Sequence, residues 1–364
     1  MKNQKDIFYL QMAYALAEKA VGWASPNPYV GAVLVKGDTI VGDGYHEKPG
    51  QPHAEVVALR KAGSLARNST AYITLEPCVH WGKTPPCIDA LLPAGLKRVV
   101  ISDLDPNPLV YKRGVKKIKE AGIEVSVGLL QEKNRRLNET YLKYITKKIP
   151  FVTAKAAVSL DGKIGTKKFS SRWISSPETR EYFHLLRGEY DALIIGVNTL
   201  IKDDPLLTIR HPNWKGKRLT RIILDSHLRF PLKARILSTL WQGKILVFTT
   251  KNASEKKADA LRKSGVEVVI LSSSRISLKK ALSWLGLHEI SSVLVEGGGR
   301  LLTSMYEEKL VDKAFVSISP KLIGGVTAPS LLQGKGVNLI KDSLHLKKTH
   351  FFQIEEDIIM EGYF

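Results

Sequence analysis

Cysteine is scarce in this chain of 364 residues, which holds only Cys78 and Cys87. A disulfide scaffold is therefore excluded, and we expect a reducing location, the cytoplasm. No apolar run approaches the roughly 20 residues that a membrane-spanning helix needs. Asp6 lies where the apolar core of a secretory signal would have to begin, so we expect neither a signal peptide nor a membrane partner.

Acidic residues are also scarce, with 35 Asp and Glu against 55 Lys and Arg, a net charge of +20. Such an excess predicts an anionic partner: nucleic acid, an anionic membrane or a small phosphorylated ligand. The densest basic clusters, 112–119 and 135–136, fall in stretches with helical spacing, which is typical of solvated helix faces. Charge alone does not choose among these partners.

Strand-like apolar runs alternate with helix-like segments along the whole chain, which predicts a layered α/β architecture. In the first part we expect a helix near 7–17, helices beginning near 53, 86 and 114, a charged helix at about 130–147, and strands at 30–35, 71–75, 98–101 and 123–127. In the second part we expect helices near 178–187, 278–285 and 300–308, and strands at 151–158, 192–195, 221–224, 244–248, 266–270, 292–295 and 314–318. Pro150 separates two domains, 1–147 and 150–364.

The first domain carries a candidate metal site. His53 is followed at a distance by Cys78 and Cys87, and each cysteine comes directly after a proline. One imidazole and two thiolates suit Zn²⁺ and leave a fourth tetrahedral position for water, as in catalytic sites. Zinc lowers the pKa of such a water toward about 7. We therefore expect one Zn²⁺ per chain, on these three residues.

Glu55 lies two residues after the histidine, so it can carry a proton from that water to a departing amine. This arrangement is typical of zinc nucleobase deaminases. A lone His-x-Glu arises by chance, and paired free cysteines usually belong to an inert core, but the joint pattern favours catalysis. One departure is the spacing, because eight residues separate the cysteines where the usual signature has two.

The extra loop, VHWGKTPP, is polar and basic, which suits an anionic substrate. Together with SPNPYVGAVLV at 25–35, GDGYH at 42–46, GQPHAEV at 50–56 and DPNP at 105–108, it resembles the deaminase half of the bifunctional riboflavin-biosynthesis deaminase/reductase family. The resemblance implies a cytidine-deaminase-like three-layer α/β/α fold, zinc at the ligands given above, Glu55 as proton shuttle, and removal of a ring amine from a diaminopyrimidinone ribosyl phosphate.

The resemblance also implies substrate contacts from Asn27, His46, His80, Lys83, Thr84, Asp105 and Asn107. For the two asparagines, turn chemistry beside proline remains the alternative. After DPNP the family usually has small residues and glycine, whereas this chain has Tyr111 and Lys112, which changes the conformations open to that loop.

The second domain lacks the Gly-x-Gly-x-x-Gly fingerprint. VLVEGGGRLL at 293–302 instead predicts a strand, a glycine turn and a helix N-terminus, which can receive a phosphate or simply form a tight turn. With KAAVSLDGKIGT at 155–166, SRWIS at 171–175 and the stretch 184–210, it resembles the reductase half of the same family, which is similar to dihydrofolate reductase. The resemblance therefore spans nearly the whole chain.

By that resemblance, NADPH contacts Ala157, Trp173, Thr199, Asp203, Ser226, Gly297, Gly298 and Gly299, and the substrate contacts Ser171, Arg187, Leu207, Arg210 and Glu296. Lys155 and Asp203 are candidates for polarising the opened sugar and delivering a proton. A solvated helix-end role for Arg187 and a structural role for Lys155 stay open. The reduction converts a ribosyl group into a ribityl chain, with hydride from the cofactor.

The leading hypothesis is thus a cytoplasmic two-site enzyme that deaminates and then reduces one small phosphorylated pyrimidine. Its reductase half is a candidate surface for homo-oligomer formation, and neither nucleic acid nor membrane is expected as a partner. A nucleic-acid-editing deaminase would share the zinc chemistry but leaves the reductase-like half unexplained. A zinc-stabilised binding module leaves Glu55 unexplained, because structural sites usually have four protein ligands.

Overall fold

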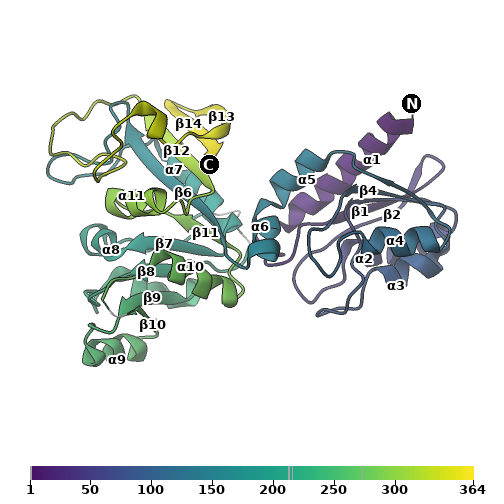
Figure 1. Cartoon of the computed structure of the whole chain (residues 1–364), viewed down its shortest axis with the longest axis horizontal. Helices are drawn as coiled ribbons and strands as arrows, with labels where there is room; N and C mark the ends of the chain where they lie inside the picture. Colours follow the sequence, from purple (N-terminus) through teal and green to yellow (C-terminus); the bar gives the residue numbers. More distant parts are fainter. Residues whose placement is uncertain (1, 212–213, 215, 273) are drawn as a thin grey trace. The chain divides into compact units, whose positions relative to one another are not determined.

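The computed structural model describes the whole chain except residues 1, 212–213, 215 and 273. The chain forms two compact units, Met1–Lys148 and Ile149–Phe364, shown in Figure 1 and described in turn below. Within the described residues, no helix combines the length and the apolar character needed to cross a membrane.

The first unit is built on a five-stranded sheet with the order β2-β1-β3-β4-β5. Its strands are β1 (Gly31–Lys36), β2 (Thr39–Tyr45), β3 (Thr70–Leu75), β4 (Arg98–Asp103) and β5 (Glu124–Val127). Strand β1 pairs antiparallel with β2 and β3, and β3, β4 and β5 are parallel. The helices are α1 (Lys2–Ala17), α2 (Ala54–Ala62), α3 (Ile88–Leu91), α4 (Arg113–Glu120), α5 (Gln131–Leu137) and α6 (Glu139–Lys147), with 3-10 turns at 18–20, 63–66 and 92–94.

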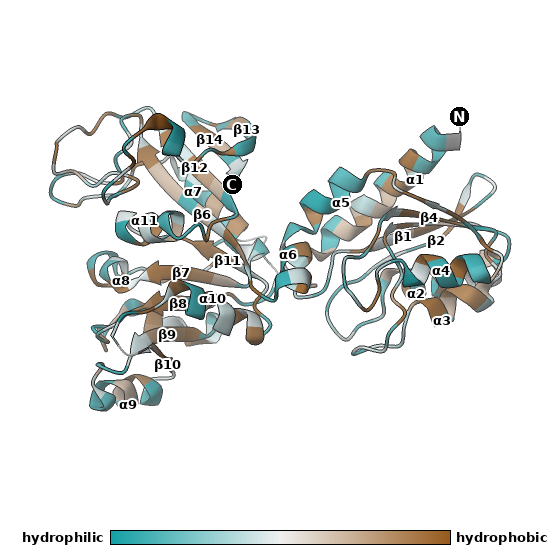
Figure 2. Cartoon of the chain, in the orientation of Figure 1, coloured by the Kyte–Doolittle hydropathy of each residue, from teal (hydrophilic) through white to brown (hydrophobic). Residues whose placement is uncertain are grey.

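Strands β1 and β4 are mostly apolar, as their brown colour in Figure 2 shows, and helices pack against both faces of the sheet. Along β1, Val33 and Val35 face helix α1, whereas Ala32 and Leu34 belong to the opposite core with α2, α3 and α4. Alternate residues of a strand point to opposite faces, so one short run serves two cores. The result is an α/β/α sandwich.

Two local expectations for the first unit were wrong. The charged helix expected at 130–147 is two helices, α5 and α6, because the buried Asn138 interrupts it. Its amide turns to the backbone of Tyr29, accepting from the N–H at 2.7 Å and donating to the C=O at 3.1 Å. Strand β2 was not expected, since its sequence TIVGDGY has little apolar alternation and two glycines.

Those two glycines of β2 set the position of helix α2. A Cβ on Gly42 would lie 2.2 Å from the carbonyl oxygen of Ala58, and one on Gly44 would lie 2.7 Å from that of Ala54. Only glycine permits this approach of strand to helix. The start of α2, where His53 and Glu55 lie, is thereby held against the sheet.

The second unit is built on a nine-stranded sheet with the order β10-β9-β8-β7-β11-β6-β12-β14-β13. The strands are β6 (Phe151–Ser159), β7 (Ala192–Gly196), β8 (Thr220–Leu224), β9 (Ile245–Thr250), β10 (Glu267–Ser272), β11 (Ser292–Val295), β12 (Lys313–Ser319), β13 (Lys347–Ile354) and β14 (Asp357–Tyr363). The helices are α7 (Pro177–Leu186), α8 (Val197–Asp203), α9 (Glu255–Lys263), α10 (Leu278–Leu287) and α11 (Gly299–Glu307), with 3-10 turns at 187–189, 235–242 and 340–342.

The strands from β10 to β12 are all parallel, and β14 and β13 continue the sheet antiparallel. Residues of β7 again divide between two cores: Leu193 and Ile195 pack with helices α7, α8 and α9, and Ala192 and Ile194 pack with α10 and α11. The seven strands expected from β6 to β12 are all present. Helices α8 and α9 and the closing hairpin β13–β14 were not expected.

Candidate functional site

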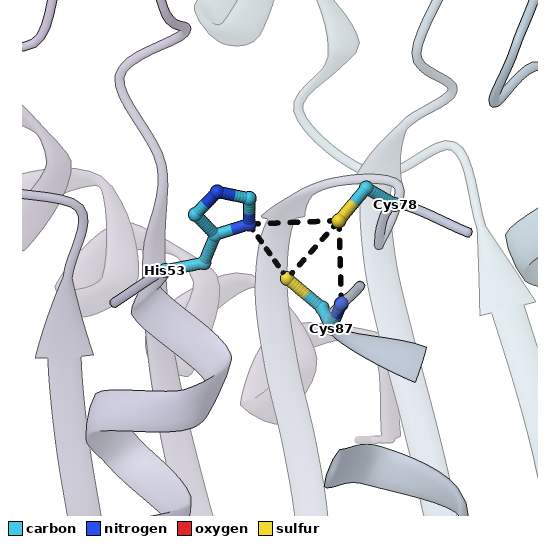
Figure 3. A group of neighbouring side chains, drawn as sticks. All are labelled: His53, Cys78 and Cys87. Carbon is cyan, nitrogen blue, oxygen red and sulfur yellow. Dashed lines mark hydrogen bonds between the residues drawn. The ribbon is translucent and has the colours of Figure 1, made fainter. Parts of the chain in front are cut away.

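The candidate metal ligands converge in the first unit, as Figure 3 shows. His53 directly precedes α2, Cys87 directly precedes α3, and Cys78 follows β3. The Nδ1 atom of His53 lies 2.8 Å from Cys87 Sγ and 3.5 Å from Cys78 Sγ, and the two sulfurs are 3.5 Å apart. The sequence-predicted trio therefore forms one cluster.

The geometry of this trio fits zinc. A tetrahedral ion with Zn–S bonds of about 2.3 Å and a Zn–N bond of about 2.0–2.1 Å separates its ligand atoms by about 3.5–3.8 Å. Both contacts of the Cys78 sulfur have this length, and only the 2.8 Å contact between His53 and Cys87 has to widen. Three soft protein ligands leave one coordination position for water or substrate.

The two thiols share a proton, which prepares them for a cation. A hydrogen bond from Cys87, reinforced by His53 and by the backbone N–H of Cys87, lowers the pKa of Cys78 to about 4. The same shared proton, together with burial, raises the pKa of Cys87. Metal binding requires both thiolates and therefore releases that proton.

Glu55 lies in the first turn of α2 and is buried. Burial raises the pKa of its carboxyl group, while the charge of His53 opposes that rise. The carboxylate is within hydrogen-bonding contact of the Cys87 thiol, so it lies beside the ligand cluster. A carboxyl group with a raised pKa, next to a metal-activated water, is suited to take up and return a proton.

His46 and Asn27 form the opposite wall of the cluster. The ring of His46 packs edge-on against that of His53, with centroids 5.0 Å apart. Its Nδ1 lies 3.3 Å from the carbonyl oxygen of Pro52 and its Nε2 lies 2.9 Å from Asn27 Nδ2. The carbonyl requires the proton on Nδ1, so Nε2 accepts from the asparagine. Burial and the neighbouring His53 lower the pKa of His46, which keeps its ring neutral.

In the loop between the cysteines, Thr84 was expected to contact substrate but contacts a metal ligand instead. The hydroxyl of Thr84 lies 3.1 Å from His53 Nε2, so it orients the metal-ligand ring. His80 Nδ1 is a buried ring nitrogen to which the described residues offer no hydrogen bond. Lys83 is exposed. His80 and Lys83 therefore remain the loop's better candidates for contact with substrate.

Asp105 and Asn107 lie in the loop after β4. The Tyr141 hydroxyl donates to both carboxylate oxygens of Asp105, at 2.9 and 3.0 Å, and burial raises the pKa of this carboxyl to about 6. The side-chain oxygen of Asn107 accepts from the N–H of Leu109 at 3.1 Å. The turn chemistry left open for Asn107 is thus present in the structure.

Glu76 was not singled out as a functional residue, yet it organises this loop. It is buried and accepts backbone hydrogen bonds from Lys112 at 3.0 Å, Val115 at 3.1 Å and Asp105 at 3.4 Å. An acidic residue at the end of the apolar strand β3, directly before Pro77, was the available signal. Lys112 itself adopts a left-handed conformation, with φ 60° and ψ −4°, where glycine would be unstrained.

A second candidate site is a cavity of about 940 Å³ in the second unit. The expected residues that line it are Ser171, Thr199, Asp203, Ser226, Gly298 and Gly299. Helix α11 begins at this cavity, because Gly298 is its N-cap and Gly299 its first residue. Unpaired N–H groups and the positive end of the helix dipole make such a start favourable for phosphate. A volume of this size suits a dinucleotide.

Asp203, the last residue of α8, borders the cavity. Burial raises the pKa of its carboxyl group, and the positive charges of Arg172 and Lys202 oppose this rise. The exposed indole of Trp173 carries the Arg180 guanidinium 4.3 Å above its ring. Trp173 is not among the residues that line the cavity, and neither is Ala157 or Gly297. These three expected cofactor contacts lie outside the lining as the structure shows it.

The expected substrate residues form a separate charged chain. Arg187 and Glu296 make a two-pronged ion pair, with Nε to Oε1 at 2.7 Å and Nη2 to Oε2 at 2.6 Å. Both side chains are 14% exposed, so the alternative of a solvated helix-end arginine is wrong. Burial favours a higher pKa for Glu296. The charge and hydrogen bonds of Arg187, with smaller contributions from Lys155 and His184, nevertheless lower this pKa to about 2. The Glu296 carboxylate thus occupies the guanidinium fork of Arg187, which had been expected to contact substrate.

Three further residues flank this pair. Lys155, on β6, packs its ammonium 4.4 Å from the centre of the Phe183 ring, and burial lowers its pKa although Glu296 opposes the shift. Leu207 is buried in the apolar core, so only its backbone is available to a ligand. Arg210 is exposed. Sequence reasoning missed His184, whose ring contacts both Arg187 and Arg210; its i, i+3 spacing from Arg187 on a helix was the available signal.

Comparison with known proteins gives the family. A family model described as "RibD C-terminal domain" matches residues 150–360, and one described as "Cytidine and deoxycytidylate deaminase zinc-binding region" matches residues 3–103. The riboflavin biosynthesis protein RibD of Aquifex aeolicus is 46% identical over 361 residues, which are 99% of each chain. The Escherichia coli protein of the same name is 36% identical and covers 98% of each chain.

Two solved structures are similar over the whole chain. RibD of Acinetobacter baumannii has a TM-score of 0.88 at 35% identity and covers 100% of this chain and 99% of its own. A Thermotoga maritima protein, described as a diaminohydroxyphosphoribosylaminopyrimidine deaminase and 5-amino-6-(5-phosphoribosylamino)uracil reductase, has a TM-score of 0.87 at 33% identity, with the same coverage. The expected cytidine-deaminase-like unit followed by a reductase unit is confirmed. The chain belongs to the RibD family of bifunctional, zinc- and NADPH-dependent deaminase/reductases of riboflavin biosynthesis.

Proposed function

We propose that residues 1–147 deaminate 2,5-diamino-6-ribosylamino-pyrimidinone 5′-phosphate and that residues 150–364 then reduce its ribosyl group to a ribityl chain. The observation that carries the first step is the convergence of His53, Cys78 and Cys87 within 3.5 Å, with the buried Glu55 beside them. A metal-ligand trio with an adjacent proton carrier is the minimum that hydrolytic removal of a ring amine requires.

In the deamination, Glu55 is the catalytic acid and base. When bound, zinc supplies a water molecule whose pKa is lowered toward about 7. Glu55 takes a proton from the attacking water and delivers it to the departing amine, which leaves as ammonia; its raised pKa favours both transfers. Thr84 keeps the His53 ring in the tautomer that presents Nδ1 to the metal.

The pyrimidine and its ribosyl phosphate occupy the space in front of this cluster. The residues assigned to substrate are Asn27, His46, His80, Lys83, Asp105 and Asn107. Asn27 and the neutral His46 are already linked at 2.9 Å and present a polar edge beside the metal ligands. The unpartnered Nδ1 of His80 gives the ring an additional polar partner, and the exposed Lys83 suits the phosphate.

In the reduction, the cavity of the second unit receives NADPH. Gly298 and Gly299 at the start of α11 would hold its pyrophosphate, and Thr199, Asp203 and Ser226 would supply further contacts from the cavity wall. Ala157, Trp173 and Gly297, the other residues assigned to the cofactor, lie outside the lining. When bound, NADPH supplies the hydride. The cavity volume of about 940 Å³ and the helix start at one of its walls support this assignment.

The sugar-phosphate end lies at the charged chain of Arg187, Glu296 and Arg210, with Ser171 and the Leu207 backbone as further contacts. Lys155 and Asp203 are the residues assigned to deliver the proton that the opened sugar requires; burial lowers the pKa of Lys155 and raises that of Asp203, which makes proton release by the lysine and proton uptake by the aspartate easier. Glu296 orients Arg187 through their two hydrogen bonds.

The deciding experiment incubates the zinc-analysed protein with the diaminopyrimidinone phosphate, with and without NADPH, and follows both products. We expect the deaminated ribosyl compound to accumulate without NADPH and the ribityl compound to form with it. Activity only on an added tRNA would favour a nucleic-acid-editing deaminase. Stoichiometric zinc without turnover of any substrate would favour a binding module.

We propose a cytoplasmic enzyme, since thiolates that are to hold zinc require a reducing compartment. Neither nucleic acid nor a membrane is a proposed partner. We also propose that the second unit carries a self-association surface: β13 is an edge strand, and Phe351 and Ile358 on its hairpin are 59% and 48% exposed. An open edge with exposed apolar side chains favours pairing with a second copy. Light scattering after size exclusion measures the resulting mass.

A further inference from the structure

His184, on helix α7, lies between two guanidinium groups of the second unit. Its Nε2 is 2.8 Å from Arg210 Nη2, and its Nδ1 is 3.1 Å from Arg187 Nη1. Histidine, unlike arginine, is able to accept a hydrogen bond, but a neutral imidazole does so at only one of its two nitrogens. One of the two contacts is therefore the true hydrogen bond.

The surroundings identify that bond. Arg187 already has acceptors: both oxygens of Glu296, and the carbonyl oxygen of Thr208 at 3.0 Å from Nη1. The contact with Arg210 is also the shorter of the two, at 2.8 Å against 3.1 Å for Arg187, which favours Nε2 as the acceptor and puts the proton on Nδ1. The lone pair is then on Nε2, where it accepts from Arg210.

The ring stays neutral in this environment. The charged groups that face it are Arg187, Arg210 and Glu296. Burial and the two cations lower the pKa of His184 to about 4, although the Glu296 charge opposes the shift. At physiological pH the imidazole is thus a fixed acceptor for Arg210.

Arg210 is the exposed arginine of this charged chain and is available to a ligand. The fork of Arg187 is taken by the Glu296 carboxylate, whereas Arg210 is exposed and has five N–H donors, of which one faces His184. An exposed arginine loses side-chain freedom when it binds a phosphate, and a neighbour that already holds the guanidinium lowers this cost.

We propose that His184 is a positioning residue that holds Arg210 for the 5′-phosphate of the reductase substrate and so sets the preference for a phosphorylated over a dephosphorylated sugar. The inference rests on the proposed reduction. It assigns phosphate recognition to Arg210 through His184, and assigns Arg187 to orientation of Glu296.

The test compares His184→Gln with His184→Leu. Glutamine places an amide oxygen near the position of Nε2, whereas leucine offers no acceptor. In His184→Leu we expect KM for the phosphorylated substrate to rise roughly tenfold or more, the loss of one hydrogen bond to a charged group, with kcat nearly unchanged. His184→Gln restores KM, and KM for the dephosphorylated substrate is the same in all variants. His288→Leu, an exposed histidine on another helix end, is the matched control.

A second measurement separates this inference from the reaction itself. Ribose 5-phosphate is titrated calorimetrically into the full-length wild type and each variant, which requires no turnover. Weaker binding in His184→Leu, restored by His184→Gln, supports the inference even if the wild type reduces nothing. Equal binding in all variants of an active enzyme overturns it and leaves the proposed reduction intact. Equal effects on the phosphorylated and dephosphorylated substrates, or a change confined to kcat, also overturn it.

If His184→Leu does not fold, His184→Asn takes its place. Asparagine reaches the position of Nδ1 but not that of Nε2, so it keeps a polar group on the side of Arg187 and loses the contact with Arg210. We expect its phosphate binding to be weakened as in the leucine variant. Wild-type affinity in a folded His184→Asn protein would contradict the positioning role.

Discussion

The two candidate sites of this enzyme are assembled in opposite ways. The metal trio comes from one stretch of chain, with sequence separations of 34, 25 and 9 residues, and its side chains point at a common centre that a cation completes. In the second unit, Arg187 and Glu296 are 109 residues apart and satisfy each other. A short motif therefore identifies the first site, whereas the second depends on which of several charged residues the fold pairs.

The two sites also differ in what a substitution is expected to cost. The thiol pair shares a proton that metal binding displaces, and burial raises the pKa of Glu55, so the protonation of the first site changes with metal binding and reaction. The pair Arg187–Glu296 is only 14% exposed, and its two charges already satisfy each other. Removing one member of such a pair leaves an uncompensated buried charge, whereas removing the proton carrier of the first site mainly removes chemistry.

The sharpest test of the contrast is Glu55→Gln. We expect deamination to fall by about 10²- to 10⁴-fold, because a positioned acid/base group contributes that much, while bound zinc stays at one per chain. NADPH oxidation with the deaminated substrate remains within twofold, since the second unit is untouched. Metal analysis and the two assays check this. Full deamination by the variant would disprove the proton-carrier role.

Glu296→Gln is expected to act on stability as well as on activity. It leaves Arg187 buried without its carboxylate, which costs about 3–5 kcal/mol of the unfolding free energy. We expect the variant to lose reductase activity and to keep deaminase activity. The denaturant concentration at the midpoint of unfolding should decrease for the second unit only. Denaturant unfolding followed per unit measures the shift.

The double variant Arg187→Met/Glu296→Leu is the control for this effect. It removes both charges and should recover most of the lost stability without recovering reduction. An unchanged transition in Glu296→Gln would contradict a buried, stabilising pair.

The sequence predicts the metal ligands of the first site because such ligands are rare residue types whose spacing is constrained. His53, Cys78, Cys87 and Glu55 all lie together as expected. What the sequence could not show is the use of a common side chain: Thr84 turns to His53, and Glu76 ties the following loop together. Any serine, threonine or glutamate has many such partners, and only the fold selects one.

Which strands could be predicted from the sequence also depends on how distinctive their residue pattern is. The parallel strands β6 to β12 are apolar on both faces and read as continuous runs, so all seven were predicted. The hairpin β13–β14 was missed, because β13 is exposed almost throughout and has no apolar periodicity to detect. Likewise, nothing in the sequence shows that the fork of Arg187 closes on Glu296 instead of a phosphate.

Acidification is expected to act in opposite directions through His184 in the second unit and Asp105 in the first. His184 has a pKa lowered to about 4, so between pH 6.5 and 4 the unfolded chain binds a proton that the folded one does not, and the second unit loses stability as pH falls. The pKa of Asp105 is raised to about 6, so the folded first unit binds the extra proton between pH 6 and 4 and gains stability there.

Between pH 7 and pH 5, each group should change the unfolding free energy of its unit by about 1–2 kcal/mol, after allowing for solvent screening. Unfolding of both units at pH 7 and pH 5, at saturating zinc, measures the two slopes. His184→Gln should remove the first slope and Asp105→Asn the second. The pair of Arg187 with Glu296 does not contribute in this range, since the pKa of Glu296 is about 2. Changes of slope with the same sign in His184→Gln and Asp105→Asn would break the contrast.

The smallest expected effect concerns the loop that closes the first site. Lys112 is held at φ 60° by the bond from its N–H to Glu76, in a conformation that costs an L-residue about 1–2 kcal/mol. Lys112→Gly should therefore raise the unfolding free energy of the first unit by about 1 kcal/mol and leave the second transition in place. Lys117→Gly removes the same charge inside helix α4 and should lower the free energy by about 1 kcal/mol. Both variants keep the bond to Glu76, so deamination stays at the wild-type rate. A loss of stability in Lys112→Gly would mean that the left-handed residue is not strained there.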